Sequence, residues 1–474
     1  MGFNVSWLSK VAVVLMIYRT LDAAVQPFFP GDDSVTNSAR SVANGSLMPY
    51  IHNVITPARL RLLTILYVSH LTGWSQNPPL PLASVPSGLC EKAFQVTLAA
   101  ANPQTSIRYT LDGSLPSASN GLLYESPLLI SNTSILRASI ELNTNVASAL
   151  TLSYLFPEQI LSTLDSRAFP ETDEGRAALR GLPWLSVVAD PNALFGPDGI
   201  YTNPDHRGMD AEIPISVEWL NDPTGTFHTQ AGLRIHGGAA RQHPKRPFRF
   251  HFRALYGDAK LNYPLFPGST ASRFDSLVLR SGGQDAWTEP QRAVLGSLAY
   301  HATYLRDAFV RRTEHDIGLL APHGRFCHLF LNGSYWGVYN LQERPTAEYF
   351  SEKLGGLEED WDVLRAGGPV VGGVQRVDVA DGDDIAWNAL QALGDPNIAP
   401  EQALEQAKAF LDIDAFCNSM ISRMWAGDAD WLGPASFMGI TLLPQSRNWI
   451  AARSSRAESP GPFHFFAWDA EISL

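Results

Sequence analysis

The sequence predicts an α+β protein in which a small antiparallel β-sandwich precedes a larger α+β domain. Residues 93–140 contain short alternating strands separated by Gly, Asn and Pro turns, a spacing typical of a small sandwich. After residue 182, strand-like segments alternate with segments of helical period. The chain has 33 Pro and 37 Gly but only 17% charged residues, which favours short strands and loops over long exposed helices.

The length and charge of the chain narrow the classes of protein that it can belong to. A chain of 474 residues is long enough for two or three domains. The net charge of −12 argues against a general affinity for nucleic acid or anionic lipid. Cys90, Cys327 and Cys417 are widely spaced and form no CxxC motif, so they support neither a disulfide scaffold nor a zinc site.

The N-terminal region, residues 1–80, contains two apolar segments with basic flanks, at 11–18 and 62–74. Both are shorter than the roughly 20 residues that span a bilayer, so we expect no stable transmembrane span. Their length and flanks are those of a signal peptide, and the second follows Met48, an alternative start. We therefore expect a secreted or cell-envelope protein; the alternative is that these segments are buried in a core.

A β-module is predicted over residues 81–156, and its start overlaps a Pro-rich stretch at 77–90 that is typical of a linker. Asp112-Gly113 marks a tight turn between two strands, because glycine tolerates a positive φ. Asp112 is thus interpreted as a turn residue and not as a catalytic acid.

The motif "IRYTLDGSLPSASNGLLYESPLLISNTSILRASI" resembles the chitobiase/β-hexosaminidase C-terminal type of module. The residues that carry the resemblance are Tyr109, Thr110, Asp112, Gly113, Ser114, Pro116, Tyr124, Pro127, Leu136 and Ala138. It implies an immunoglobulin-like accessory module with no chemistry of its own.

A polar linker is predicted at residues 157–181, and the second domain at 182–474. We expect a helix over most of 289–318 and one or two helices over 400–425, followed by a strand at 463–468. Asn332-Gly333 lies between two alternating aromatic strands and predicts a type I′ hairpin.

A candidate phosphate-binding segment combines Gly237, Gly238 and Lys245. Adjacent glycines allow the backbone to approach a ligand, and a lysine on the next strand can neutralise phosphate oxygens. The alternative is an ordinary turn followed by a solvated basic strand. The segment is not a Walker A motif, which requires G-x-x-x-x-G-K-[ST] at the start of a helix.

Several blocks, among them "FLNGSYWGVYNLQERP", "DADW" and "FFAWDAE", resemble the spore-coat CotH kinase family of bacterial proteins. The resemblance covers about residues 182–474 and implies a two-lobed, kinase-like α+β fold. The H-R-D and D-F-G motifs of standard protein kinases are absent. Related domains continue beyond W-D-x-E, so we expect this domain to be truncated at its C-terminus.

The resemblance assigns a role to individual residues. Gly237, Gly238, Lys245 and Glu343 would bind ATP, with Lys245 on phosphate and Glu343 at the edge of the nucleotide pocket. Asp430 would accept the proton of a hydroxyl substrate. Asp469 would bind Mg²⁺, and Glu471 would be a second ligand if the strand continues to it.

Two functions from different classes follow from the sequence. The first is an exported, ATP- and Mg²⁺-dependent phosphotransferase that acts on a protein hydroxyl. The second is a catalytically inactive surface or matrix protein that uses the kinase-like fold as a scaffold, because Ala435 stands where relatives have a metal-binding Asn. Hydrolysis of a glycoside by Asp430 and Asp469 is a weaker alternative, since the sugar-enzyme motif lies in the accessory module.

Overall fold

The computed structural model divides the chain into two compact units, Met1–Pro79 and Leu80–Leu474. The structure describes the following residues: 80–140, 149–164, 172–286, 302–366, 370–371, 374–375, 377–428, 431, 436–437, 440–441, 448–456, 458 and 460–473. The two expected export segments, Asp430 and Ala435 therefore lie outside the described residues. In the described part of the chain, no helix is long and apolar enough to cross a bilayer.

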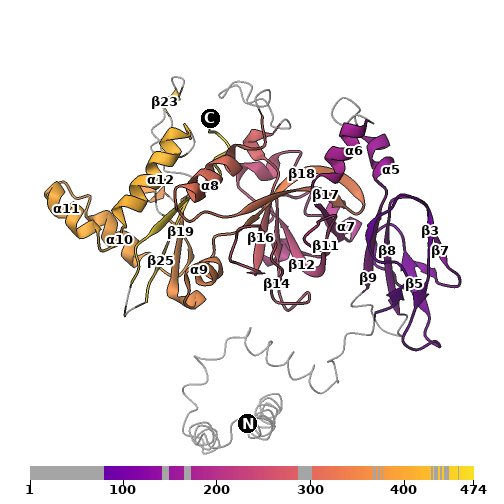
Figure 1. Ribbon diagram of the computed structural model, residues 1–474. Coiled ribbons are helices and arrows are strands. Elements are labelled where there is room, and N and C mark those ends of the chain that lie inside the picture. Colours follow the sequence, from indigo (N-terminus) through magenta and orange to yellow (C-terminus); the bar gives the residue numbers. More distant parts are fainter. Residues whose placement is uncertain are drawn as a thin grey trace, which may run out of the picture. The chain divides into compact units, whose positions relative to one another are not determined.

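The first β-module is built from three small sheets that share one hydrophobic core (Figure 1). Its five-stranded sheet has the order β2 (Gly88–Leu89), β9 (Leu150–Leu155), β8 (Ser134–Ile140), β5 (Ile107–Thr110) and β6 (Leu122–Leu123). Two strand pairs accompany it: β1 (Leu82–Ala83) with β4 (Leu98–Ala99), and β3 (Phe94–Val96) with β7 (Leu128–Ile130). The β2–β9 pair is parallel. The short predicted strands are present, and the immunoglobulin-like arrangement stays a prediction.

The predicted linker contains two helices, α5 (Pro157–Thr163) and α6 (Asp173–Arg180). Their buried leucine and isoleucine side chains belong to one hydrophobic cluster with Leu155 of the β-module and with Trp184 and Phe330 of the next domain. The linker segment is therefore part of a packed core.

A closed seven-stranded barrel follows, in the order β10 (Trp184–Ala189), β11 (Ile213–Leu220), β12 (Phe227–Ile235), β13 (Phe248–His251), β16 (Ser276–Arg280), β18 (Ser334–Glu343) and β17 (Gly324–Leu331). All pairs are antiparallel except β10–β17, which closes the barrel. Asn332 and Gly333 connect β17 to β18 with φ values of 47° and 80°, which confirms the predicted hairpin turn.

Short elements connect the barrel strands. They are α7 (Pro191–Phe195), the two-stranded pair β14 (Leu261–Asn262) and β15 (Arg273–Phe274), and the 3₁₀ helices η1 (Met209–Ala211), η2 (Ala239–Gln242) and η3 (Gly283–Asp285). Between β12 and β13 the chain thus forms a loop with a 3₁₀ helix, η2, where the sequence suggested either a glycine turn or a phosphate-binding loop.

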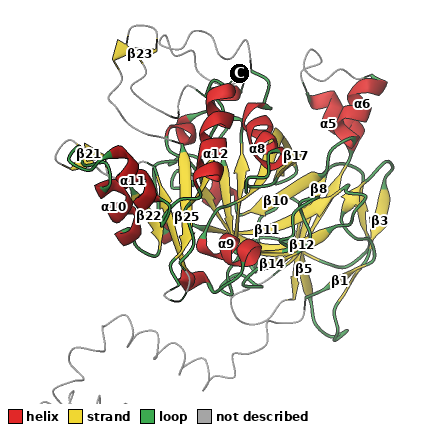
Figure 2. Cartoon of the chain, turned by 60° about the vertical axis from the view of Figure 1, so that its left-hand side comes forward, coloured by secondary structure: helices red, strands yellow, loops and turns green. Residues whose placement is uncertain are grey.

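A second, four-stranded sheet has the order β22 (Asp378–Asp381), β19 (Trp361–Arg365), β25 (Trp449–Ser454) and β26 (His464–Ala467). Helix α12 (Ile413–Trp425) packs against β26 and against α8 (Arg306–Asp316), and Figures 1 and 2 show the two helices side by side. The remaining elements of this region are α9 (Ala347–Leu354), η5 (Glu358–Asp360), α10 (Ile385–Ala392), α11 (Pro400–Ala407), β20 (Val370–Val371), β21 (Val374–Gln375), β23 (Ser436–Phe437) and β24 (Ile440–Thr441).

The α+β class is confirmed by these sheets and helices. The helices predicted over 400–425 are present as α11 and α12, and the final strand is present as β26. Of the helix predicted over 289–318, the described part is α8. The two-lobed kinase arrangement stays a prediction.

Candidate functional site

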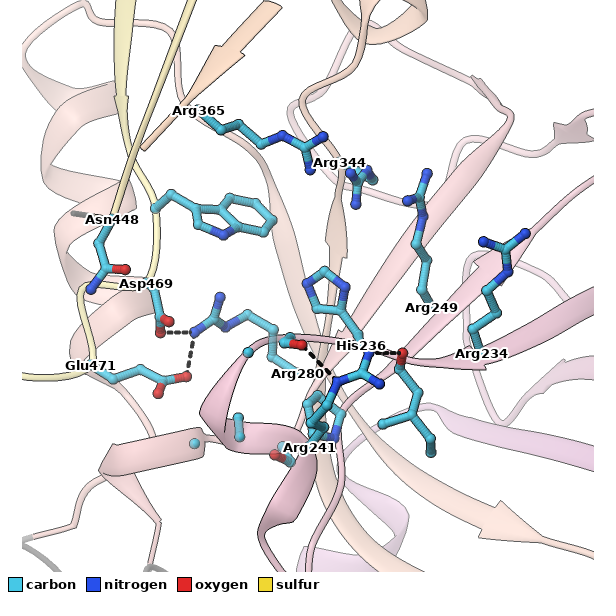
Figure 3. Close-up of a pocket in the computed structure, with 18 of the residues that line it drawn as sticks. Arg234, His236, Arg241, Arg249, Arg280, Arg344, Arg365, Asn448, Asp469 and Glu471 are labelled. Carbon is cyan, nitrogen blue, oxygen red and sulfur yellow. Dashed lines mark hydrogen bonds and ion pairs between the residues drawn. The ribbon is translucent and has the colours of Figure 1, made fainter. Parts of the chain in front are cut away.

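A cavity of about 590 Å³ lies against the outer face of the barrel (Figure 3). It is lined from one side by β12, β13 and β16 and from the other by β19, β25 and the segment after β26. Strand alternation explains the barrel side, because Phe248 and Phe250 point into the barrel core while Arg249 and His251 line the cavity. The volume is within the range typical of sites for small ligands.

The cavity is strongly cationic. Among the residues that the structure describes, three carboxylates line it, those of Asp378, Asp469 and Glu471. Seven arginines among the described residues also line it: Arg207, Arg234, Arg241, Arg249, Arg280, Arg344 and Arg365. Burial and the neighbouring arginines lower the pKa of His236 far below its ordinary value and that of His251 to about 2, so both rings are neutral near pH 7. The excess positive charge fits an anionic ligand.

Arg280, at the end of β16, is the centre of an ion-pair cluster in this cavity. One of its terminal nitrogens donates to a carboxylate oxygen of Asp469 and to one of Glu471 (Figure 3). Its Nε lies 3.9 Å from Oδ2 of Asp307 on α8. Burial alone would lower the pKa of Arg280, but the three carboxylates outweigh it and raise that pKa well above its ordinary value. Arg280 is therefore a permanent cation.

The turn that carries Asp469 is held by α8. Strand β26 ends at Ala467, and Asp469 has φ of 64°, an uncommon value for a residue with a side chain. Asp307 accepts a hydrogen bond from the backbone N–H of Ala470 at 3.2 Å, and Glu314 accepts one from Ala467 N–H at 3.2 Å. The condition on which Glu471 was a candidate second ligand, that the strand continues to it, is not met. The turn nevertheless directs Asp469 and Glu471 to the same arginine.

Comparison with known proteins adds to this geometry. A family model described as CotH kinase protein matches residues 233–474, which is about half of the chain and includes most of the cavity. The chain belongs to the CotH kinase family. A second family model, the chitobiase/β-hexosaminidase C-terminal domain, matches residues 85–151. No curated protein matches the chain. Both resemblances expected from the sequence are confirmed.

The CotH kinase domain brings together four of the predicted site residues. Gly237 and Gly238 line the same cavity as Asp469 and Glu471. Gly237 has φ of 86°, which suits glycine, and its carbonyl accepts a hydrogen bond of 2.9 Å from Nε of Arg241. Arg241 thus holds this glycine loop from within the cavity wall.

Lys245 and Glu343 are not among the residues that line this cavity of the CotH kinase domain. The Lys245 ammonium donates to the carbonyl of Val338 and lies 4.6 Å from the ring centres of both Tyr304 and Tyr339. Burial lowers the pKa of Lys245 to about 7. The predicted role of Lys245 on phosphate stays a prediction.

Glu343 is fully buried at the end of β18. It lies 2.9 Å from Nζ of Lys353, accepts from the hydroxyl of Ser269 at 2.6 Å and lies 3.1 Å from Nδ1 of His323. Burial opposes ionisation, but these partners outweigh it, so the pKa of Glu343 is lowered. Glu343 is therefore an ionised anchor between β18 and α9, next to the cavity-lining Arg344.

Sequence reasoning missed the arginines that dominate the CotH kinase cavity, chiefly Arg249, Arg280, Arg344 and Arg365. One local signal was present: in "FRFHF" the alternation places Arg249 and His251 on the face opposite the phenylalanines. The other arginines lie on separate strands, so no short motif contains them.

Asp469 and Glu471 present carboxylate oxygens, the type of ligand that magnesium prefers, but in the structure both are paired with Arg280. Mg²⁺ prefers oxygen ligands and usually takes one or two carboxylates, with waters and substrate phosphates completing its shell. The two carboxylates already converge on one cation, the Arg280 guanidinium, inside a cavity suited to anions. Among the described residues there is no group of three or more His, Cys, Asp or Glu side chains arranged for a metal, so phosphate oxygens would have to supply further ligands.

Proposed function

We propose that this CotH kinase family protein is an exported phosphotransferase that moves the γ-phosphoryl group of ATP to a hydroxyl of a protein. The observation that carries the proposal is the convergence of Asp469 and Glu471 on Arg280 inside a cationic cavity. This arrangement supports the proposal because a phosphotransferase needs cationic groups for a polyphosphate and carboxylates for its metal, and the cavity contains both.

Each residue of the proposed site has a chemical role. Arg280 would neutralise charge on the transferring phosphoryl group, and the backbone at Gly237 and Gly238 would approach the phosphates. Asp469 and Glu471 would hold Mg²⁺, which when bound neutralises phosphate charge. In the transfer, the acceptor oxygen bonds to the γ-phosphorus and the bond to the β–γ bridging oxygen breaks. ADP leaves, and the hydroxyl proton passes to Asp430, which lies outside the described residues.

Residues 1–79 would export the protein. Reporter fusions test this part of the proposal separately. We expect residues 1–79 fused to an enzyme that is active only outside the cytoplasm to give activity, and a fusion lacking them to give none.

Transfer from γ-labelled ATP in the presence of Mg²⁺ tests the catalytic part, together with calorimetric ATP binding. We expect label in protein with the wild-type chain and none with Asp469→Asn. Asp316→Asn, an exposed carboxylate paired with Arg312 on α8, is the matched control and should keep activity. Mg²⁺-dependent ATP binding without transfer would instead support the inactive scaffold that Ala435 suggests, and absence of ATP binding would refute the nucleotide site.

A further inference from the structure

A row of arginines follows one side of the cavity, apart from the carboxylates. Figure 3 shows Arg365, Arg344, Arg249 and Arg234 in a row from the top of the site to its right, whereas Arg280 lies near the centre and Asp469 and Glu471 at the left. They come from β12, β13, β19 and the residue after β18, so four distant segments supply them.

Within this row of four arginines, Arg344 has the fewest polar contacts with the residues that the structure describes. It is 8% exposed, and its side chain forms no hydrogen bond or ion pair with any residue that the structure describes. Arg249 has one weak contact, 3.4 Å to the hydroxyl of Ser276. Arg365 lies 3.5 Å from Asp378, a half-exposed carboxylate. The buried Nε atoms of all three arginines lack a partner, although buried polar atoms normally have one.

The local electrostatics explain why this arrangement is unfavourable without a ligand. Burial and the charges of Arg249 and Arg365 lower the pKa of Arg344 well below its ordinary value. Asp275 and Asp381 act in the opposite direction but do not compensate. Three buried guanidinium groups that face one cavity with few counter-charges repel one another and destabilise the protein without a ligand. An anion bound among them would supply the missing counter-charge and stabilise the folded protein.

We propose that Arg249, Arg344 and Arg365 form a binding subsite for a phosphate group. A phosphate presents several oxygens to planar guanidinium groups, which can bind them in a bidentate manner, and its double negative charge matches more than one arginine. This proposal holds whether or not the protein transfers phosphoryl groups, because a catalytically inactive protein with this fold would contain the same three arginines. The phosphate group belongs either to the nucleotide or to a second molecule.

Calorimetry with inorganic phosphate and the full chain tests the subsite. We expect saturable binding to the wild-type protein, weakened at least roughly tenfold in Arg344→Gln and in Arg365→Gln. Arg365 is 31% exposed, so that variant should fold even if the change at buried Arg344 disturbs packing. Arg273→Gln removes the same charge at an exposed position paired with Glu352, outside the cavity, and should bind phosphate like the wild type.

Unchanged phosphate affinity in Arg344→Gln and Arg365→Gln, or no binding to the wild type, would overturn the proposal. Titration in saturating Mg²⁺-ATP then identifies the source of the phosphate group. Binding that persists assigns the subsite to a second, phosphate-bearing molecule, and competition assigns it to the nucleotide. The Arg280→Gln variant separates this proposal from the proposed nucleotide site. We expect it to lose binding of Mg²⁺-ATP but to bind inorganic phosphate like the wild type.

Discussion

Replacing Arg280 with methionine removes the cation that three carboxylates share. The side chain of Glu471 is 6% exposed and would remain buried without its arginine. Asp307, which is 11% exposed, would keep its 3.1 Å ion pair with Arg311. Asp469 is 38% exposed, so water screens its part of the cluster. Leaving a buried charge unpaired typically costs about 3–5 kcal/mol, a large part of the roughly 5–15 kcal/mol that stabilises a folded protein.

Urea unfolding of Arg280→Met at several pH values measures this cost. At about pH 8 we expect a free energy of unfolding lower by about 3–5 kcal/mol than in the wild type. Burial already raises the pKa of Glu471 well above its ordinary value, although Arg280 lowers it. Loss of Arg280 raises this pKa further, so the folded variant binds more protons than the folded wild type and the difference in stability shrinks as the pH falls.

Mg²⁺ should stabilise Arg280→Met more than the wild type, since the carboxylates of Asp469 and Glu471 no longer bind an arginine. The control Arg312→Met breaks an exposed pair with Asp316 and should change stability by no more than about 0.5 kcal/mol. A stability for Arg280→Met equal to that of the wild type near pH 8 would refute the buried ion-pair cluster.

Three further predictions concern other parts of the domain. Burial raises the pKa of Glu314 to about 7, so the folded protein binds a proton at this carboxyl more tightly than the unfolded chain does. The contribution of this proton to the free energy of unfolding is fully present below about pH 4.5 and is lost as the pH rises through 7. Glu314→Gln should flatten the pH dependence of the unfolding free energy in that window and stabilise the protein above it by up to about 3 kcal/mol. Lys245→Met should change ATP affinity less than about twofold, because the side chain does not line the cavity; calorimetry would reveal a larger loss if this lysine binds phosphate. Leu155→Ala should cost about 2–5 kcal/mol in urea unfolding, since Leu155 is fully buried in the cluster that contains Trp184 and Phe330; a loss below about 0.5 kcal/mol would contradict this shared core.

The sequence predicted local structure well where one turn or one period determines it. Asn332-Gly333 specifies a hairpin because both residues tolerate positive φ, and that turn is present. The predicted final strand is also present, but its end was not foreseeable. The turn at Asp469 is held by Asp307 and Glu314, more than 150 residues earlier in the chain.

The composition of the site was predictable only in part. Asp469 and Glu471 lie within the short W-D-x-E motif, so both could be predicted from the sequence alone. Arg280 and Arg344 become neighbours of that motif only when the barrel closes and the four-stranded sheet packs beside it. The sequence places Lys245 close to the glycine pair, but it does not reveal the direction or burial of the side chain, whose ammonium lies near the rings of Tyr304 and Tyr339.

The closed barrel also has a practical consequence for anyone who wishes to produce the CotH kinase domain alone. The matched family region begins at residue 233, whereas β10 and β11 precede it and pair with β17 and β12. A fragment that starts at residue 233 would lack β10 and β11 and would keep only 233–235 of β12, so β17 and this remnant of β12 would form two open edges, which invite pairing with other chains. Expression should therefore begin before Trp184, and best before the β-module whose Leu155 completes the adjoining core.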